Sequence, residues 1–151
     1  MTDQRALAFL YAEDDPDDRL LAEMAHRQSG VPNPLLFVPD GEAAVARLRL
    51  MSRSVDRPDE PRPGIVLLDL NMPGIDGRET LRIIRADPAI RRTPVVILTT
   101  STADADIAAS YDAGTNAYIV KPTAFSDLVH IFTTLAAFWF TVTSLAKEIP
   151  Q

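Results

Sequence analysis

The chain has 151 residues, of which 46% are hydrophobic and 24% are charged, a composition typical of one globular domain over residues 1–151. It contains no cysteine, which excludes disulfides, thiolate metal sites and a cysteine nucleophile. Twenty-one acidic and fifteen basic residues give a net charge of −6, which argues against nucleic acid as a direct partner.

The N-terminus, "MTDQRALAFLYAEDD", carries acids where a signal peptide needs basic residues followed by a long apolar run. No uncharged apolar stretch approaches the roughly eighteen residues that a membrane span requires. We therefore expect a cytoplasmic protein that makes no contact with a membrane.

Five short apolar runs alternate with amphipathic segments. The runs that predict strands are 6–12, 34–38, 65–68, 93–98 and 117–120. The segments that predict helices are 17–28, 41–51, 77–86, 104–113 and a long apolar stretch from Phe125 onward. Five strand–helix repeats with short connections predict an α/β fold of the flavodoxin-like, doubly wound kind. It would hold one five-stranded parallel sheet, helices on both faces and an extended C-terminal helix.

Residues 52–64, "SRSVDRPDEPRPG", are polar and contain three prolines, so we expect a surface loop rather than a domain boundary. The predicted core runs from about residue 6 to residue 137. Residues 138–151 would form a C-terminal extension.

Polar side chains follow four of the predicted strands. Glu13 and Asp14 come after the first strand, Asp69 after the third, Thr99 after the fourth and Lys121 after the fifth. In a doubly wound sheet the functional crevice lies outside the carboxyl ends of the strands. The fold therefore predicts three carboxylates, a hydroxyl and an ammonium gathered in one crevice.

Three carboxylates in one crevice repel one another unless a cation compensates them, and a hard divalent cation takes oxygen ligands. We expect Mg²⁺, with Mn²⁺ as the alternative. Asp14 and Asp69 would bind the ion directly, and Glu13 would act through a water or from behind these ligands. The backbone carbonyl of Asn71 would be a third protein ligand.

A carboxylate beside such an ion can act as a nucleophile toward a phosphoryl group. Asp69 would then form an aspartyl-phosphate. Lys121 would pair with the phosphoryl oxygens, and the hydroxyl of Thr99 would donate a hydrogen bond to one of them.

Four motifs carry a resemblance to a known family: "FLYAEDDPDD", "VLLDLNMPGIDG", "VVILTTS" and "AYIVKP". Together and in this order they resemble the receiver domain of a two-component response regulator, over roughly residues 7–137. The resemblance implies that Asp69 accepts a phosphoryl group from a sensor histidine kinase. It implies a switch hydroxyl at Thr99, a switch aromatic at Tyr118 and a cis bond between Lys121 and Pro122. Phosphorylation would remodel the surface of the fourth helix, fifth strand and fifth helix, so the protein would signal rather than act as an enzyme.

The proline-rich segment 52–64 and the long apolar final helix resemble stand-alone regulators partnered with bacterial phytochromes and similar sensor kinases. On a helical wheel the apolar arc of the final helix covers about 220°, whereas a helix that covers one sheet needs about 100°. We therefore expect a homodimer through this helix and its extension. The residues assigned to that interface are Phe138, Trp139, Phe140 and Leu145. The alternative is a helix folded back over the core.

Two other functions stay open. A haloacid-dehalogenase-type phosphohydrolase also uses a strand-end aspartate, but its motif resembles Asp-x-Asp, and Asn71 stands at the second position here. A receiver-like adaptor would bind its partner without phosphorylation. Thr100 occupies a position that controls access to the phosphoryl group, and the direction of its effect on hydrolysis stays open.

Overall fold

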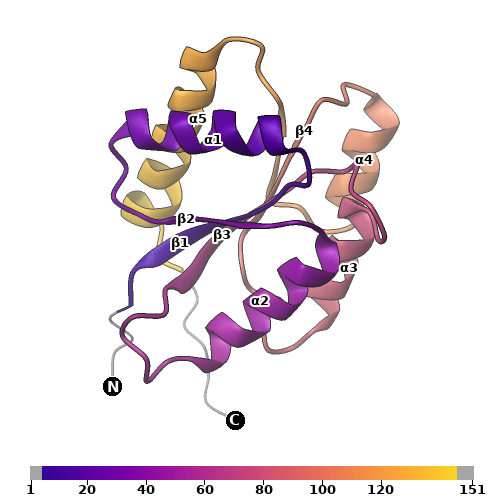
Figure 1. Cartoon of the computed structure of the whole chain (residues 1–151). Coiled ribbons are helices and arrows are strands. Elements are labelled where there is room, and N and C mark those ends of the chain that lie inside the picture. Colours follow the sequence, from indigo (N-terminus) through magenta and orange to yellow (C-terminus); the bar gives the residue numbers. More distant parts are fainter. Residues whose placement is uncertain (1–4, 146–151) are drawn as a thin grey trace.

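The computed structural model describes residues 5–145 and contains one parallel sheet in the order β2-β1-β3-β4-β5 (Figure 1). The strands are β1 (Leu7–Ala12), β2 (Leu35–Val38), β3 (Arg62–Leu68), β4 (Val95–Thr99) and β5 (Ala117–Val120). The register pairs Ala12 with Leu68 and Thr99 with Val120, so strand ends meet at one edge of the sheet. This topology confirms the predicted flavodoxin-like fold.

Five α-helices follow the strands: α1 (Pro16–Ser29), α2 (Gly41–Arg53), α3 (Gly77–Ala86), α4 (Asp104–Asp112) and α5 (Phe125–Ala136). Figure 1 shows α1 and α5 on one face of the sheet and α2 and α3 on the other. Each face buries its own apolar cluster. One is centred on Leu10, Leu48 and Leu81, and the other on Phe9, Leu67 and Phe132.

Aspartates fix the starts of the first three helices. The carboxylate of Asp15 accepts hydrogen bonds from two backbone N–H groups of α1, and Asp40 and Asp76 each accept one in α2 and α3. These bonds satisfy N–H groups that have no partner inside a helix. Pro16, at the first helical position, has no N–H to satisfy. The connections from β1 to α1 and from β2 to α2 are therefore short, whereas residues 69–76, which include Asp69, separate β3 from α3.

The predicted surface loop at 52–64 is shorter than expected. Helix α2 continues to Arg53, and β3 begins at Arg62, so the irregular segment is 54–61. Ser52 is buried on α2, and the added Cβ of any residue replacing Gly64 would collide with the ring of Phe140. The prolines correctly predicted an irregular connection. The residues on either side of it belong to α2 and β3, which pack on the core.

The final helix changes its winding before it ends. After α5 the chain continues as a π-helix, η1 (Ala137–Val142). The wider turn directs Phe140 back to the sheet, where its ring lies 5.0 Å from that of Phe9 between centroids. Phe140, assigned from the sequence to a dimer interface, is therefore half-buried against the core of its own chain. Phe138 is 49% exposed and Trp139 is half-buried. The centroids of their two rings lie 4.7 Å apart. Leu145 is half-buried, and residues 146–151 of the predicted extension lie outside the described residues.

One described helix is long and apolar enough to cross a membrane by length and composition alone, namely residues 125–142. Three of its residues, Phe132, Leu135 and Ala136, are buried against the sheet. Within residues 5–145 no peptide bond is cis, so the expected cis bond between Lys121 and Pro122 is trans.

Candidate functional site

Four side chains predicted to meet at the carboxyl edge of the sheet do so. Glu13 follows β1, Asp69 follows β3, Thr99 ends β4 and Lys121 follows β5. Backbone hydrogen bonds continue the sheet through these positions, from Asp69 N–H to the carbonyl of Ala12 and from Lys121 N–H to that of Thr99. The sheet itself therefore fixes where each side chain starts.

Both carboxylate oxygens of Asp69 are engaged. Oδ1 accepts hydrogen bonds from the backbone N–H of Asn71 at 3.0 Å and from the hydroxyl of Thr99 at 3.2 Å. Oδ2 accepts a bond from Nζ of Lys121 at 2.6 Å. The protein therefore holds both oxygens in place. Asp69 is nevertheless 7% exposed, so solvent can still reach it.

Lys121 is the centre of an ion-pair cluster. Its Nζ lies 2.6 Å from Asp69, 2.7 Å from Glu13 and 2.8 Å from Asp18. Burial alone would lower the pKa of Lys121, but Tyr11 and the hydrogen bonds to the three carboxylates outweigh burial and raise the pKa above its usual value. Lys121 therefore stays charged.

One ammonium does not balance three carboxylates. One carboxylate oxygen from each of Glu13, Asp18 and Asp69 lies within 4.8 Å of the other two. When all three carboxylates are ionised, Lys121 compensates one negative charge and leaves two uncompensated. Burial, with Asp18 adding to it, raises the pKa of Glu13 to about 8 despite the opposing effect of Lys121. Oε2 of Glu13 is buried and has no hydrogen-bond partner. A divalent cation fits this set, because it would supply the missing charge to hard oxygen ligands.

Asp18 is the site residue that the sequence interpretation left out. The acids at 15, 17 and 18 resemble a group that favours the dipole of a helix N-terminus. Asp15 does cap α1, and Asp17 is exposed. Asp18, one residue further along α1, reaches over the strand ends and pairs with Lys121. The sequence signal that could have identified it is its position in the first turn of a helix that starts at the crevice.

Two further metal ligands are predicted, namely Asp14 and the backbone carbonyl of Asn71. Asp14 is exposed and does not belong to the described cluster of carboxylates around Lys121. Asn71 contacts Asp69 through its N–H. Direct metal binding by Asp14 and by the carbonyl of Asn71 stays a prediction.

Of the two predicted switch residues, Thr99 contacts the acceptor directly and Tyr118 contacts the loop that follows Thr99. Thr99 is fully buried against Asp69. The hydroxyl of Tyr118 donates a 2.9 Å hydrogen bond to the carbonyl of Ser101, which joins β5 to the loop after β4. Thr100 is exposed.

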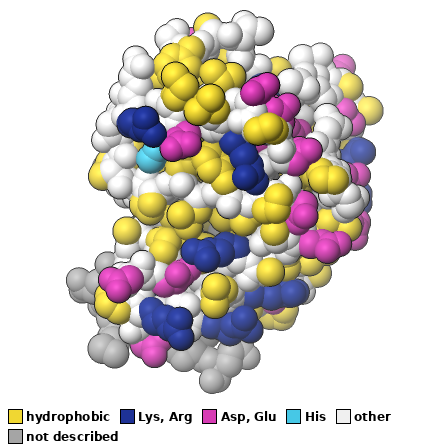
Figure 2. Space-filling model, in the orientation of Figure 1, with side chains coloured by type: hydrophobic (Ala, Val, Ile, Leu, Met, Phe, Trp, Pro, Cys, Tyr) yellow, Lys and Arg dark blue, Asp and Glu magenta, His cyan; other side chains and the backbone are white. Residues whose placement is uncertain are grey.

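Charge is unevenly spread over the surface. Figure 2 shows acidic side chains gathering at the upper right of the visible face, around the start of α1, while basic side chains lie mainly below. A positively charged metal ion would approach the crevice through this acidic region.

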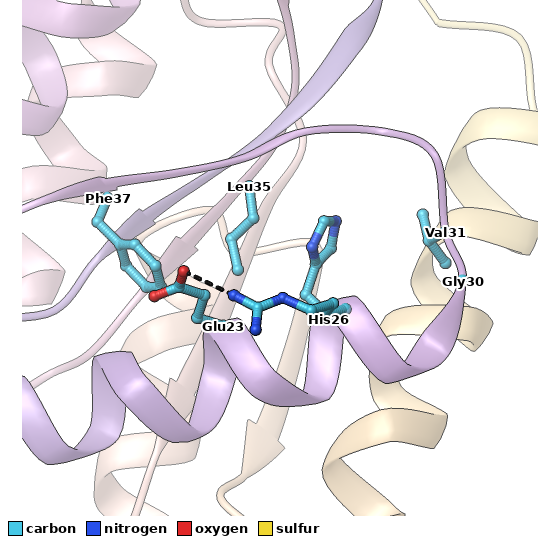
Figure 3. A pocket seen from close by; sticks show the side chains of 7 residues that line it. Glu23, His26, Gly30, Val31, Leu35 and Phe37 are labelled. Atoms are coloured by element: carbon cyan, nitrogen blue, oxygen red, sulfur yellow. Dashed lines mark hydrogen bonds and ion pairs between the residues drawn. The ribbon is translucent and has the colours of Figure 1, made fainter.

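A separate pocket of about 540 Å³ lies between the second half of α1 and the edge strand β2 (Figure 3). Glu23 and Arg27 form an exposed ion pair at its wall, and His26 points inward, where its Nε2 lies 2.6 Å from the carbonyl of Asn33. Its lining includes none of the four residues at the strand ends. This pocket is distinct from the Asp69 site.

Comparison with known proteins agrees with the fold and the motifs. Residues 9–133 match the model of the response regulator receiver domain. The chain is 36% identical over 136 residues to response regulator Rcp1 of Synechocystis, with 90% of each chain covered. The Mn²⁺-bound form of Rcp1 superposes with a TM-score of 0.74 at 34% identity, covering 93% of this chain and 99% of that one.

Two further solved structures are similar. One is the phosphorylated cyanobacterial phytochrome response regulator RcpA, with a TM-score of 0.78. The other is RPA3017, a response regulator in red light signalling of R. palustris, with a TM-score of 0.82. Each is 38% identical and covers 93% of this chain and 98% of its own. With its matching domain model, parallel sheet and strand-end residues, this chain belongs to the response regulator receiver family and is homologous to phytochrome response regulators.

Proposed function

We propose that this protein is a phosphorylation-dependent response regulator in which Asp69 accepts a phosphoryl group from a sensor histidine kinase in a Mg²⁺-dependent reaction. The observation that carries the proposal is the arrangement around Asp69. Thr99 and Lys121 donate hydrogen bonds to its two oxygens, beside a carboxylate cluster that lacks a second compensating charge.

In this reaction a carboxylate oxygen of Asp69 attacks phosphorus, the new P–O bond forms, and the P–N bond to the kinase histidine breaks. Lys121 would shift its hydrogen bonds toward the phosphoryl oxygens, and Thr99 would donate to another of them. Mg²⁺, held by Asp69 with Asp18, Asp14 or Glu13, would neutralise charge on the transferring group. Mn²⁺ is the alternative ion, and the Mn²⁺-bound form of Rcp1 supports a divalent metal at this site.

The partner we propose is a sensor histidine kinase of the bacterial phytochrome type. The similarity to RcpA and to a red-light response regulator supports this choice. A cytoplasmic location follows from such a partner. We also propose a homodimer formed by the final helix, for which the exposed Phe138 and Val142 of η1 provide an apolar surface.

The test is the intact mass of the wild type and of Asp69→Asn after incubation with acetyl phosphate and Mg²⁺, with and without EDTA. The expected result is a gain of one phosphoryl group by the wild type with Mg²⁺ only. Asp76→Asn, a change of the same kind at the cap of α3, is the matched control and should still be phosphorylated.

A folded wild type that gains no phosphoryl group would contradict the proposal and leave the constitutive adaptor. Steady release of phosphate from a small phosphate ester would instead indicate the phosphohydrolase. The same mass measurement after mixing with a phosphorylated histidine kinase would test the proposed partner.

A further inference from the structure

A hydrogen-bonded bridge joins the loop after β4 to the first turn of α4. Ser101 lies two residues beyond Thr99, and its hydroxyl donates a 2.6 Å bond to Oδ2 of Asp106. The same hydroxyl accepts a bond from the N–H of Ala103, which precedes α4. The carbonyl of Ser101 is the acceptor for Tyr118. The position of Ser101 thus determines whether Tyr118 finds its partner.

The other oxygen of Asp106 connects the bridge to the acceptor side of the crevice. Oδ1 lies 3.7 Å from Nη1 of Arg78, the second residue of α3. The helix begins directly against the acceptor, because a Cβ at Gly77 would collide with the backbone carbonyl of Asp69. Asp106 therefore contacts both the loop that directly follows Thr99 and the helix whose first residue, Gly77, lies against Asp69.

We propose that Asp106 is a positioning residue that holds the loop after β4, through Ser101, in the arrangement that places Thr99 on Asp69 and Tyr118 on the Ser101 carbonyl. This inference rests on the proposed function and adds a residue to it. Asp106 touches neither the acceptor nor a phosphoryl group and acts through Ser101.

The two contacts of Asp106 differ in strength. A short bond from a hydroxyl to a carboxylate is charge-assisted, and losing one changes a local equilibrium by roughly tenfold. The pair with Arg78 is longer and a third exposed on both sides, so its loss should change the equilibrium about twofold. Ser101 is therefore the main route of the effect.

The experiment compares four variants: Asp106→Ala, Ser101→Ala, the double variant and Asp106→Asn. Asp104→Ala is the matched control, because Asp104 also lies in the first turn of α4 but is exposed and has no contact with Ser101. The first readout is amide hydrogen exchange of residues 100–107 in unphosphorylated protein. The second is the rate of phosphoryl gain from acetyl phosphate with Mg²⁺.

We expect roughly tenfold faster exchange in Asp106→Ala, and at least as large an increase in Ser101→Ala, which also removes the bond from the N–H of Ala103. The double variant should show little further increase over Ser101→Ala, because both changes remove the bond between Ser101 and Asp106. Asp106→Asn, which keeps an acceptor, should show a smaller increase, and Asp104→Ala should resemble the wild type. The rate of phosphoryl gain should fall in step with the increase in exchange, because Thr99 loses its position.

Equal exchange in Asp106→Ala and Asp104→Ala would overturn the proposal. Faster exchange with an unchanged rate of phosphoryl gain would also overturn it, since Asp106 would then order the loop without acting on Thr99. If the wild type gains no phosphoryl group, the proposed function fails, while hydrogen exchange still decides whether Asp106 holds the loop.

Discussion

Lys121 donates a hydrogen bond of 2.6 Å to Asp69, although the two residues are 52 positions apart and follow strands that do not pair with each other. The strand between them is β4, whose last residue, Thr99, donates to the other oxygen of Asp69. The side chain of Lys121 therefore reaches from the end of β5 across the end of β4 to Asp69 at the end of β3. Its four-carbon stem makes this contact possible, and the same ammonium also contacts Glu13 and Asp18.

Replacing this ammonium should destabilise the protein in a metal-dependent way. Lys121→Met leaves three neighbouring carboxylates without their cation, and breaking a buried ion pair on one side costs about 3–5 kcal/mol. We expect the free energy of unfolding in urea with EDTA to fall by about 3 kcal/mol. Mg²⁺ should restore a larger share of stability in the variant than it adds to the wild type.

Arg27→Met is the control for loss of a positive charge. Its partner is Glu23, and the side chain of Arg27 is 74% exposed, so the loss should be below about 1 kcal/mol and independent of Mg²⁺. Equal losses in the two variants, or no response of Lys121→Met to Mg²⁺, would show that the cluster does not bind a cation.

Asp18 should contribute to metal affinity. Asp18→Asn removes one of the three carboxylates grouped around Lys121, and loss of a carboxylate at or behind a metal ligand typically costs about tenfold or more in affinity. Asp17→Asn removes the same charge from the same helical turn at an exposed position. Calorimetric titration with Mg²⁺ should give a dissociation constant about tenfold higher for Asp18→Asn only. Equal weakening of Mg²⁺ binding in both variants would show that Asp18 only adds to the general electrostatic attraction of the ion.

The residues that the sequence located correctly are those whose backbone positions follow from the sheet. Parallel strands bring their carboxyl ends to one edge, so motifs at the ends of β1, β3, β4 and β5 predict that Glu13, Asp69, Thr99 and Lys121 meet. Asp18 depends instead on the rotation of α1 relative to that edge. Its neighbours Asp15 and Asp17 offered an equally good explanation as helix-capping or dipole residues.

The final helix could not be placed because its winding changes. A helical wheel assumes 100° per residue, and the π-helix at 137–142 turns less per residue. The error accumulates toward Phe140, which the sequence analysis assigned to the dimer interface and which packs beside Phe9. The apolar composition of the segment correctly predicted a helix that packs on the core. It did not predict which aromatic side chain faces the sheet.

Phe140 and Phe138 should therefore differ in their contribution to stability. Phe140→Ala removes a ring that contacts Phe9 and covers Gly64, and loss of a core phenylalanine costs about 3–5 kcal/mol, less here because Phe140 is half-buried. We expect a loss of about 2 kcal/mol or more. Phe138→Ala, at a site 49% exposed, should change stability by about 0.5 kcal/mol. Urea unfolding of the monomer at low protein concentration measures both, and the reverse order would contradict the placement of Phe140.

The exposed side chains of η1 should instead govern self-association. Phe138 and Val142 are 49% and 74% exposed, and a charge at either position would have to be desolvated inside an apolar interface. We expect wild-type protein to elute as a dimer by size exclusion with light scattering, and Phe138→Glu and Val142→Glu to elute as folded monomers. Leu50→Glu, on the exposed side of α2, is the control that should remain dimeric. A monomeric wild type, with and without acetyl phosphate, would remove the dimer from the proposed function, and a dimer that both charges leave intact would place the interface elsewhere.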